Sequence, residues 1–232
     1  MLILAVDTAS EHCSAVLAEV SANVVSVRAI RSKLLGRGHA EALLPMIAAC
    51  LEEAGIAACD VDRFAATVGP GTYTGIRVGV AAVRGLALAT GCPAVGVSCL
   101  KLAGAPVATR HGGPVIAALK GRHGDVFAQV WSHDQLPLSN PMAGPPARLA
   151  EAFMSGDADP SAFPVAGSGA ADWRTVFTES VNLTDGGAPF DLDDLARFAL
   201  TEDPSVAVEP LYLRGPDAAP QTGKALPHAD QP

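Results

Sequence analysis

The clearest potential for chemistry lies in residues 69–79, which read Gly-Pro-Gly-Thr-Tyr-Thr-Gly-Ile-Arg-Val-Gly. The surrounding pattern predicts a buried strand before this segment and a helix after it. The first turn of such a helix presents unpaired backbone N–H groups and the positive end of its dipole, which together favour an anion. The segment lacks the Gly-Lys-Ser/Thr ending of a P-loop and does not match Gly-x-Gly-x-x-Gly. A phosphate site and a tight strand-to-helix turn therefore both stay open. The candidate phosphate-facing residues are Gly69, Gly71, Thr72, Thr74 and Gly75.

Asp7 and Thr8 form a second candidate, because they follow an apolar run that predicts a strand over residues 2–6. Sugar kinases, actins and related ATPases place a metal-bound or phosphate-facing acid at a position like this. A single Asp after a strand is also a common turn-forming residue. Both interpretations remain open from the residues alone.

Three further candidates are weaker. His39 has no second metal-ligand residue type three or four positions later, so we expect a capping or contact residue instead. Residues 96–100 resemble a nucleophile elbow only loosely, because Leu100 stands where the second glycine is needed. Residues 167–169, Gly-Ser-Gly, could line a cleft, but the pattern favours an ordinary turn.

The elements expected to position these residues repeat along the chain. The first half predicts an antiparallel meander of three strands, at residues 2–6, 13–20 and 24–30. A helix with Pro45 inside it follows at 39–54, then a strand at 64–68, a second helix at 75–89 and a strand at 94–97. The second half repeats this loosely, with strands at 115–119, 126–131 and 163–166, a loop at 137–146 and a helix at 192–200. This pattern predicts a duplicated α/β fold, with an N-terminal lobe over residues 1–100, a smaller divergent lobe over 101–214 and a disordered tail over 215–232.

The two helices of the first half are unusually apolar. Between residues 75 and 89 the charges are Arg77 and Arg84, which are seven positions apart and share one face. A helix this apolar must be covered on nearly every side, so a second chain is a candidate for its outer face. A wholly intramolecular core is the alternative. The residues expected at a partner or dimer interface are His39, Leu43, Leu44, Ile47, Leu51, Arg77, Ala81, Arg84 and Leu88.

The composition restricts the function classes. The formal net charge is −8, from 16 basic and 24 acidic residues, so the excess of Lys and Arg typical of a free-standing nucleic-acid binder is absent. If the protein acts on RNA, we expect another subunit to hold the RNA. The five cysteines form no Cys-x-x-Cys pair and read as reduced thiols of a cytoplasmic protein. The first residues fit neither a signal peptide nor a membrane span.

The chain resembles the TsaB/YeaZ family from residue 2 to about residue 214. The motifs that carry the resemblance lie at residues 3–9, at His39 with 43–47, and at residues 69–79, 85–88, 96–98 and 209–214. The resemblance implies an actin/hexokinase-like (ASKHA, ribonuclease H-like) two-lobe fold. It implies a non-catalytic partner of TsaD, which transfers a threonylcarbamoyl group to adenosine 37 of tRNA with the ATPase TsaE in the larger complex. Pairing in this family uses the first two helices.

The resemblance also implies what the chain lacks. TsaD has a pair of metal-binding histidines after the strand that corresponds to residues 94–97, and here residues 98–103 contain none. Lys120 follows a second-lobe strand that usually ends in an acid. We therefore expect no catalytic residue, metal or cofactor of its own, with ATP, ADP or a metal acting only in the complex. A homodimer is expected to be open to the isolated chain, and tRNA contact is expected only through the complex.

Two enzymatic alternatives remain from the sequence. One is a free-standing ATPase or small-molecule kinase, with phosphate on residues 69–75 and a metal near Asp7. The other is a metalloprotease, and the missing His-x-x-x-His pair argues strongly against it.

Overall fold

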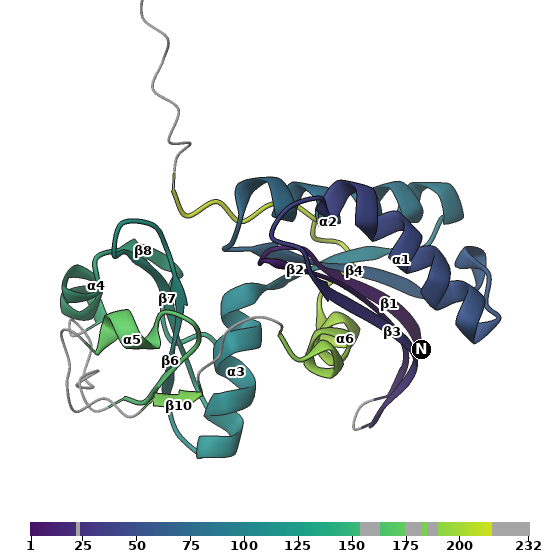
Figure 1. The fold of residues 1–232 in the computed structure, drawn as a ribbon. Coiled ribbons are helices and arrows are strands. Elements are labelled where there is room, and N and C mark those ends of the chain that lie inside the picture. The colour runs from purple at the N-terminus through teal and green to yellow at the C-terminus, as the bar shows by residue number, and fades with distance from the viewer. Residues whose placement is uncertain (22–23, 154–162, 175–181, 185–189, 215–232) are drawn as a thin grey trace, which may run out of the picture.

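The computed structural model describes residues 1–21, 24–153, 163–174, 182–184 and 190–214. Two five-stranded sheets lie beside each other, with a helix between them (Figure 1). The predicted tail at 215–232 lies outside the described residues.

The first sheet has the strand order β3-β2-β1-β4-β5. Its first three strands are antiparallel, and β4 and β5 run parallel to β1, as the predicted meander and crossover helices require. Two helices and a short 3-10 turn connect these strands. The elements are β1 (Leu2–Asp7), β2 (His12–Ser21), β3 (Val24–Leu34), α1 (His39–Ala54), η1 (Ala58–Asp60), β4 (Arg63–Gly69), α2 (Tyr73–Thr90) and β5 (Ala94–Ser98).

The second sheet repeats this plan in the order β10-β9-β6-β7-β8. The strands β6, β7 and β8 are antiparallel, and β9 and β10 continue in parallel from β6. The predicted duplication of an α/β lobe is therefore confirmed. The loop expected at 137–146 is partly wrong, because β8 lies within it. The elements are β6 (Val115–Lys120), β7 (Val126–Trp131), β8 (Met142–Gly144), α4 (Pro146–Phe153), β9 (Val165–Ala166), α5 (Ala170–Trp173) and β10 (Asn182–Thr184).

The last helix of each half covers the sheet of the other half. Helix α3 (Cys99–His111) follows the first sheet but packs on β6 and β7. Helix α6 (Leu192–Thr201) follows the second sheet but packs on β1 and β2, on the face opposite α1 and α2 (Figure 1). The segment 101–214, which was predicted to form one lobe, thus packs on both sheets.

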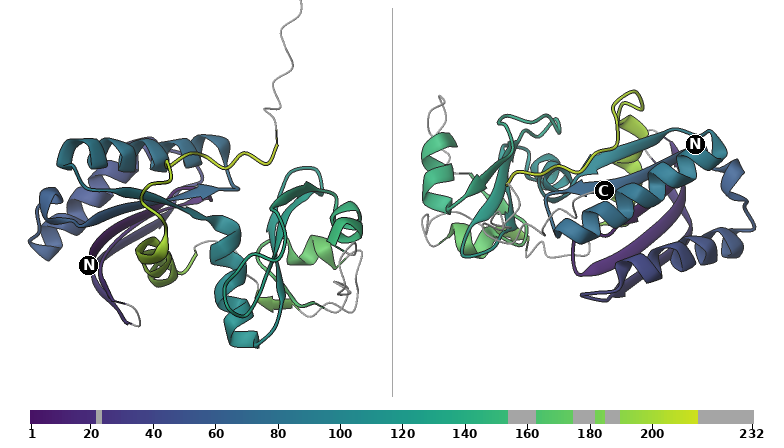
Figure 2. Two further views of the ribbon diagram at one scale, coloured as in Figure 1. Left: turned by 180° about the vertical axis from the view of Figure 1, so that it is seen from behind. Right: turned by 90° about the horizontal axis from the view of Figure 1, so that it is seen from above.

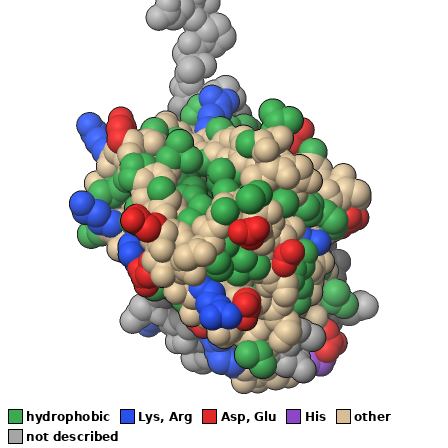
Figure 3. Space-filling view, turned by 90° about the vertical axis from the view of Figure 1, so that its right-hand side faces the viewer, with side chains coloured by type: hydrophobic (Ala, Val, Ile, Leu, Met, Phe, Trp, Pro, Cys, Tyr) green, Lys and Arg blue, Asp and Glu red, His purple; other side chains and the backbone are tan. Residues whose placement is uncertain are grey.

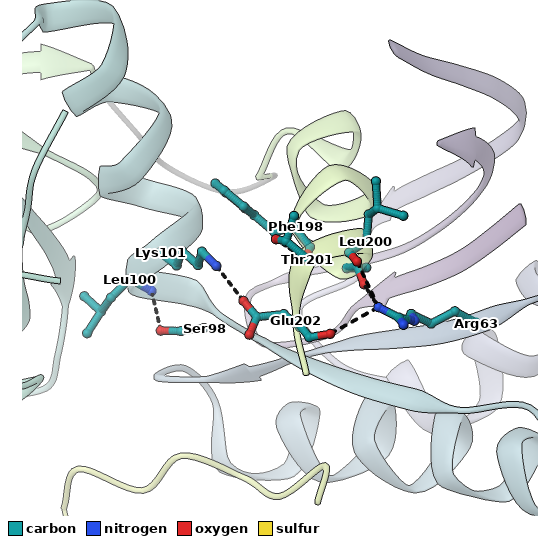
Figure 4. Close-up of polar contacts among 9 residues, drawn as sticks. Arg63, Ser98, Leu100, Lys101, Phe198, Leu200, Thr201 and Glu202 are labelled. Carbon is teal, nitrogen blue, oxygen red and sulfur yellow. Dashed lines mark hydrogen bonds and ion pairs between the residues drawn. The ribbon is translucent and has the colours of Figure 1, made fainter. Parts of the chain in front are cut away.

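A polar network holds α6 in this position (Figure 4). The buried Arg63 side chain of β4 donates through Nη1 to the carbonyl oxygens of Ala199, Leu200 and Glu202, at 2.8, 3.0 and 3.1 Å. These carbonyls lie at the C-terminal end of α6, where a positive charge is favourable. The Lys101 ammonium of α3 reaches the Glu202 carboxylate at 2.6 Å, which ties the two exchanged helices together.

Helices α1 and α2 lie next to each other across one face of the first sheet, as the view from above shows (Figure 2). Each ends at a glycine in the left-handed conformation, Gly55 and Gly91, as the pattern predicted. Helix α1 continues through Pro45, where the ring removes the hydrogen bond to the carbonyl of Glu41.

Candidate functional site

The glycine-rich segment packs tightly against the residues that follow β1. The Thr72 N–H donates to the carbonyl oxygen of Ala9 at 2.7 Å. A Cβ added at Gly71 would overlap that same carbonyl oxygen, and one added at Gly75 would overlap the carbonyl oxygen of Thr8. The absence of side chains here lets the loop and the first turn of α2 approach the Thr8–Ala9 backbone. The chain's own backbone therefore takes the space that these glycines provide.

Thr8 fastens α2 to the end of β1. Its buried hydroxyl donates to the carbonyl oxygen of Gly75 at 2.7 Å. A Cβ added at Gly79, one turn later, would lie 2.6 Å from this hydroxyl oxygen. Thr8, Gly75 and Gly79 thus form one close contact between the helix and the strand. The two threonines expected beside a phosphate are exposed, and Thr72 makes no side-chain cap to the helix.

The Asp7 side chain is buried inside the protein, next to Thr67 of the neighbouring strand β4. Its Oδ1 accepts hydrogen bonds from the Thr67 hydroxyl at 2.7 Å and from the Ala9 N–H at 3.0 Å. Its Oδ2 has no partner among the described residues. Burial raises the pKa of the Asp7 carboxyl above its ordinary value, although the two hydrogen bonds act in the opposite direction.

This arrangement fits a nucleotide or a metal poorly. In this structure the Asp7 side chain is fully shielded from solvent, and so is Thr8. A ligand bound at the protein surface would therefore contact neither side chain. Among the described residues, no group of three or more His, Cys, Asp or Glu side chains has the spacing of a metal site.

The second lobe uses glycine in the same way. The Gly169 N–H donates to the carbonyl oxygen of Ala118 at 2.9 Å, and a Cβ on Gly167 would overlap that oxygen. The Ser168 hydroxyl accepts from the N–H of Lys120 at 3.0 Å. The Gly-Ser-Gly segment is therefore a tight turn against the end of β6. The exposed Lys120 occupies the position where the resemblance led us to expect an acid.

The predicted interface residues divide between the core and the surface. His39, Leu43 and Ile47 are buried, and only 1% of Leu43 is exposed. These three form the stripe that α1 presents to its own sheet, so their assignment to an outer interface needs correction. The His39 ring nitrogen Nε2 lies 3.0 Å from the carbonyl oxygen of Ser10, a contact inside the lobe. Leu51 is half-buried.

The other predicted residues are exposed on the side of the helices that faces away from the sheet. Leu44 on α1 is 56% exposed, and Leu88 on α2 is 88% exposed. The outer stripe of α2, which we call the α2 face, carries no acidic residue, and all its members are exposed: Tyr73, Arg77, Ala81, Arg84 and Leu88. On a chain of net charge −8, this face is apolar and locally basic.

Tyr212 extends the α2 face beside Tyr73, and neither tyrosine was predicted as a site residue. Tyr73 stacks on Tyr212 with ring centroids 5.2 Å apart. The guanidinium carbon of Arg77 lies 3.8 Å from the Tyr73 ring centroid. Tyr212 belongs to the segment 209–214, whose motif was part of the family resemblance. That motif is the one signal in the sequence that could have identified Tyr212 as a site residue.

A second apolar surface lies on the edge strand β3, which exposes Val24, Val27, Ile30 and Leu34. Figure 3 shows the side of the molecule at the right of Figure 1, where hydrophobic side chains gather among charged ones. Two ion pairs, Arg28 with Glu19 and Arg31 with Glu53, involve β3. Charged side chains on an edge strand oppose further strand pairing.

Among the described residues, no helix has the length and apolar character needed to cross a membrane.

A family model described as TsaD, tRNA N6-adenosine threonylcarbamoyltransferase, matches residues 16–135. The chain is 35% identical to the tRNA threonylcarbamoyladenosine biosynthesis protein TsaB of Escherichia coli (strain K12), over 58% of this chain and 57% of that protein. It is 30% identical to an uncharacterized protein of Mycobacterium leprae, over 97% of this chain and 58% of that protein. The matches thus span less than two thirds of either relative.

Two solved structures from Pseudomonas aeruginosa resemble the whole fold. One is described as YeaZ, with a TM-score of 0.69 and 27% identity, covering 91% of this chain and 99% of that chain. The other is an uncharacterized protein with similarity to peptidase YEAZ, with a TM-score of 0.71 and 29% identity, covering 92% of this chain and 99% of that chain. The duplicated two-sheet arrangement is therefore shared with these proteins.

Proposed function

The chain belongs to the TsaB/YeaZ family, and from this premise we propose that it is a non-catalytic accessory subunit in the formation of N6-threonylcarbamoyladenosine at position 37 of tRNA. In this proposal it forms a heterodimer with TsaD, and TsaE joins the larger complex. The tRNA is held by the other subunits, since this chain has a net charge of −8.

The observation that carries the proposal is the α2 face. A helix that exposes Leu88 almost completely, with Ala81 and two arginines on the same stripe, leaves apolar surface in water. Burial of this surface in a partner is favourable, and an acidic group of the partner can pair with Arg77 or Arg84. A TsaD-type partner suits this role, because pairing through the first two helices is what the family resemblance implies.

Two features support the absence of independent catalysis. The glycines that would have to cradle a phosphate instead admit the backbone of Thr8 and Ala9. Asp7, the residue that the sequence pointed to as a metal ligand, is buried and accepts a hydrogen bond from the Thr67 hydroxyl. We therefore propose that any ATP, ADP or metal acts at the level of the complex and not on this chain alone.

The test is reconstitution of tRNA modification with TsaD and the other components, with and without this chain. The modified nucleoside is measured by mass spectrometry. We expect little product without the chain, and we expect the double variant Leu44→Glu, Leu88→Glu to behave like its omission. The matched control is Leu136→Glu, Leu138→Glu, which places the same charges on residues that are 62% and 57% exposed in the second lobe.

Full modification without the chain would overturn the proposal. Robust ATP hydrolysis by the chain alone, lost in Asp7→Asn, would instead support the free-standing ATPase or kinase. Circular dichroism of each variant checks that the fold is retained.

A further inference from the structure

The segment 209–214, which we call the strap, crosses the start of α2 and ends at the second lobe (Figure 2). Its backbone is anchored where β4 ends, because the Leu211 N–H donates to the carbonyl oxygen of Val68 at 2.7 Å. A Cβ added at Gly69 would lie 3.2 Å from the carbonyl oxygen of Leu211. The strap thus contacts the glycine-rich loop at Gly69, whereas Ala9 and Thr8 pack against Gly71 and Gly75, and residues 71–74 stay exposed.

The strap then contacts the first turn of α2 through its side chains. Tyr212 stacks on Tyr73, and its hydroxyl accepts a hydrogen bond from Arg77 Nε at 2.6 Å. The Arg77 guanidinium also lies over the Tyr73 ring. Arg77 is therefore held by the face of the Tyr73 ring and by the hydroxyl of Tyr212, although it is exposed.

The far end of the strap is tied to the second lobe. The Arg214 guanidinium forms an ion pair with the carboxylate of Asp125, in the turn between β6 and β7. One segment thus connects the end of β4, the first turn of α2 and the second lobe. Because the N-cap residue Thr72 makes no side-chain cap, the strap adds support on the outer side of that turn to the support that Thr8 and Ala9 give on its inner side.

We propose that Tyr212 is a positioning residue for partner docking, which fixes Arg77 and the first turn of α2 in the geometry that the partner meets. A free arginine side chain loses rotamer freedom when it is bound, and one already held by the Tyr73 ring and the Tyr212 hydroxyl loses less. Order at the start of the α2 face should therefore raise the affinity for a protein partner with an acidic group opposite Arg77. This inference rests on the proposed docking of TsaD to the α2 face.

The affinity for purified TsaD is measured by calorimetry for four variants of the full chain. Tyr212→Ala removes the stack and the hydrogen bond, and we expect binding to weaken roughly tenfold. Tyr212→Phe keeps the stack, and we expect a change of no more than about threefold. Glu209→Ala alters an exposed strap residue, and we expect no change. Leu88→Glu tests the α2 face itself.

Hydrogen exchange of residues 69–77 in the free protein separates positioning from general stability. We expect faster exchange there in Tyr212→Ala, with an unchanged melting temperature, and near-normal exchange in Tyr212→Phe. Unchanged affinity and exchange in Tyr212→Ala would overturn this inference, and the docking proposal would stand if Leu88→Glu still abolished binding. If Leu88→Glu bound normally, the docking proposal itself would fail. If Tyr212→Ala unfolds, Tyr212→Leu repeats the measurement with an apolar side chain that cannot stack.

Discussion

The strongest test of the close packing around α2 compares two glycines of the same helix. Gly75 faces Thr8 and has no space for a Cβ, whereas Gly85 is exposed and would place its Cβ in open space. Replacing a glycine in a helix by alanine normally stabilises a protein by about 0.5–1 kcal/mol. We expect this gain for Gly85→Ala.

Gly75→Ala should have the opposite effect. The new methyl group must displace both the carbonyl oxygen of Thr8 and the hydroxyl of Thr72, and overpacking of this kind costs about 1–3 kcal/mol. It also disturbs the hydrogen bond from the Thr8 hydroxyl to the Gly75 carbonyl, worth about 0.5–1.5 kcal/mol. After the helix gain is subtracted, we expect a net loss of about 2 kcal/mol.

Urea unfolding and thermal melting measure both variants against the unaltered chain. For a protein of this size, each kcal/mol shifts the melting temperature by roughly 2–4 °C. Gly75→Ala should therefore melt roughly 4–8 °C lower, and Gly85→Ala roughly 1–4 °C higher. If Gly75→Ala were as stable as Gly85→Ala, the glycine would not be required by the Thr8 backbone, and a ligand role for it would regain weight.

Three further predictions concern residues whose surroundings are equally distinct. Leu43→Ala should lower the free energy of unfolding, measured in urea, by about 2–5 kcal/mol, because the Leu43 side chain is buried. Leu44→Ala, at the exposed neighbouring position, should change it by less than about 0.5 kcal/mol. Equal effects would contradict the orientation of α1. The raised pKa of Asp7 means that the folded state binds its proton more tightly than the unfolded state, so the free energy of unfolding should fall as pH rises from about 3.8 through the folded-state pKa. Asp7→Asn should abolish this fall, and an unchanged pH profile would show that another group causes it. Arg63→Met should cost about 3 kcal/mol, because three carbonyl oxygens at the end of α6 lose a charged donor, and a melting temperature equal to that of the unaltered chain would refute this.

Much of the fold was predictable because its repeat is visible in the chain. The meander, the crossover helices and the second copy follow from apolar periodicity and from glycine positions. Helix α3 was missed for a physical reason: residues 102–108 are all buried between the two sheets, so no polar face alternates with an apolar one. The strands β8 and β10 have three residues each, which is too short for an alternating pattern.

The candidate site was less predictable, because the sequence shows which residues are apolar but not which partner covers them. On α1 the stripe of Leu43 and Ile47 indicated a face that needed cover, and the cover is the protein's own sheet. On α2 the stripe that ends at Leu88 stays exposed. The proposed role of Tyr212 depends on a contact with Arg77 across more than a hundred residues, which no local pattern encodes.

The glycine-rich segment shows why composition alone could not separate a phosphate loop from a packing contact. Both require glycines between a strand and a helix, because in both an oxygen approaches the backbone closely. The difference lies in which oxygen approaches. Here it belongs to Thr8 and Ala9, directly after β1, so the helix is fixed to the sheet and its outer stripe is turned toward solvent. The same contact that fills a potential ligand site therefore also orients the α2 face, so one arrangement of the backbone supports both parts of the proposed function, docking to a partner and no catalysis by this chain alone.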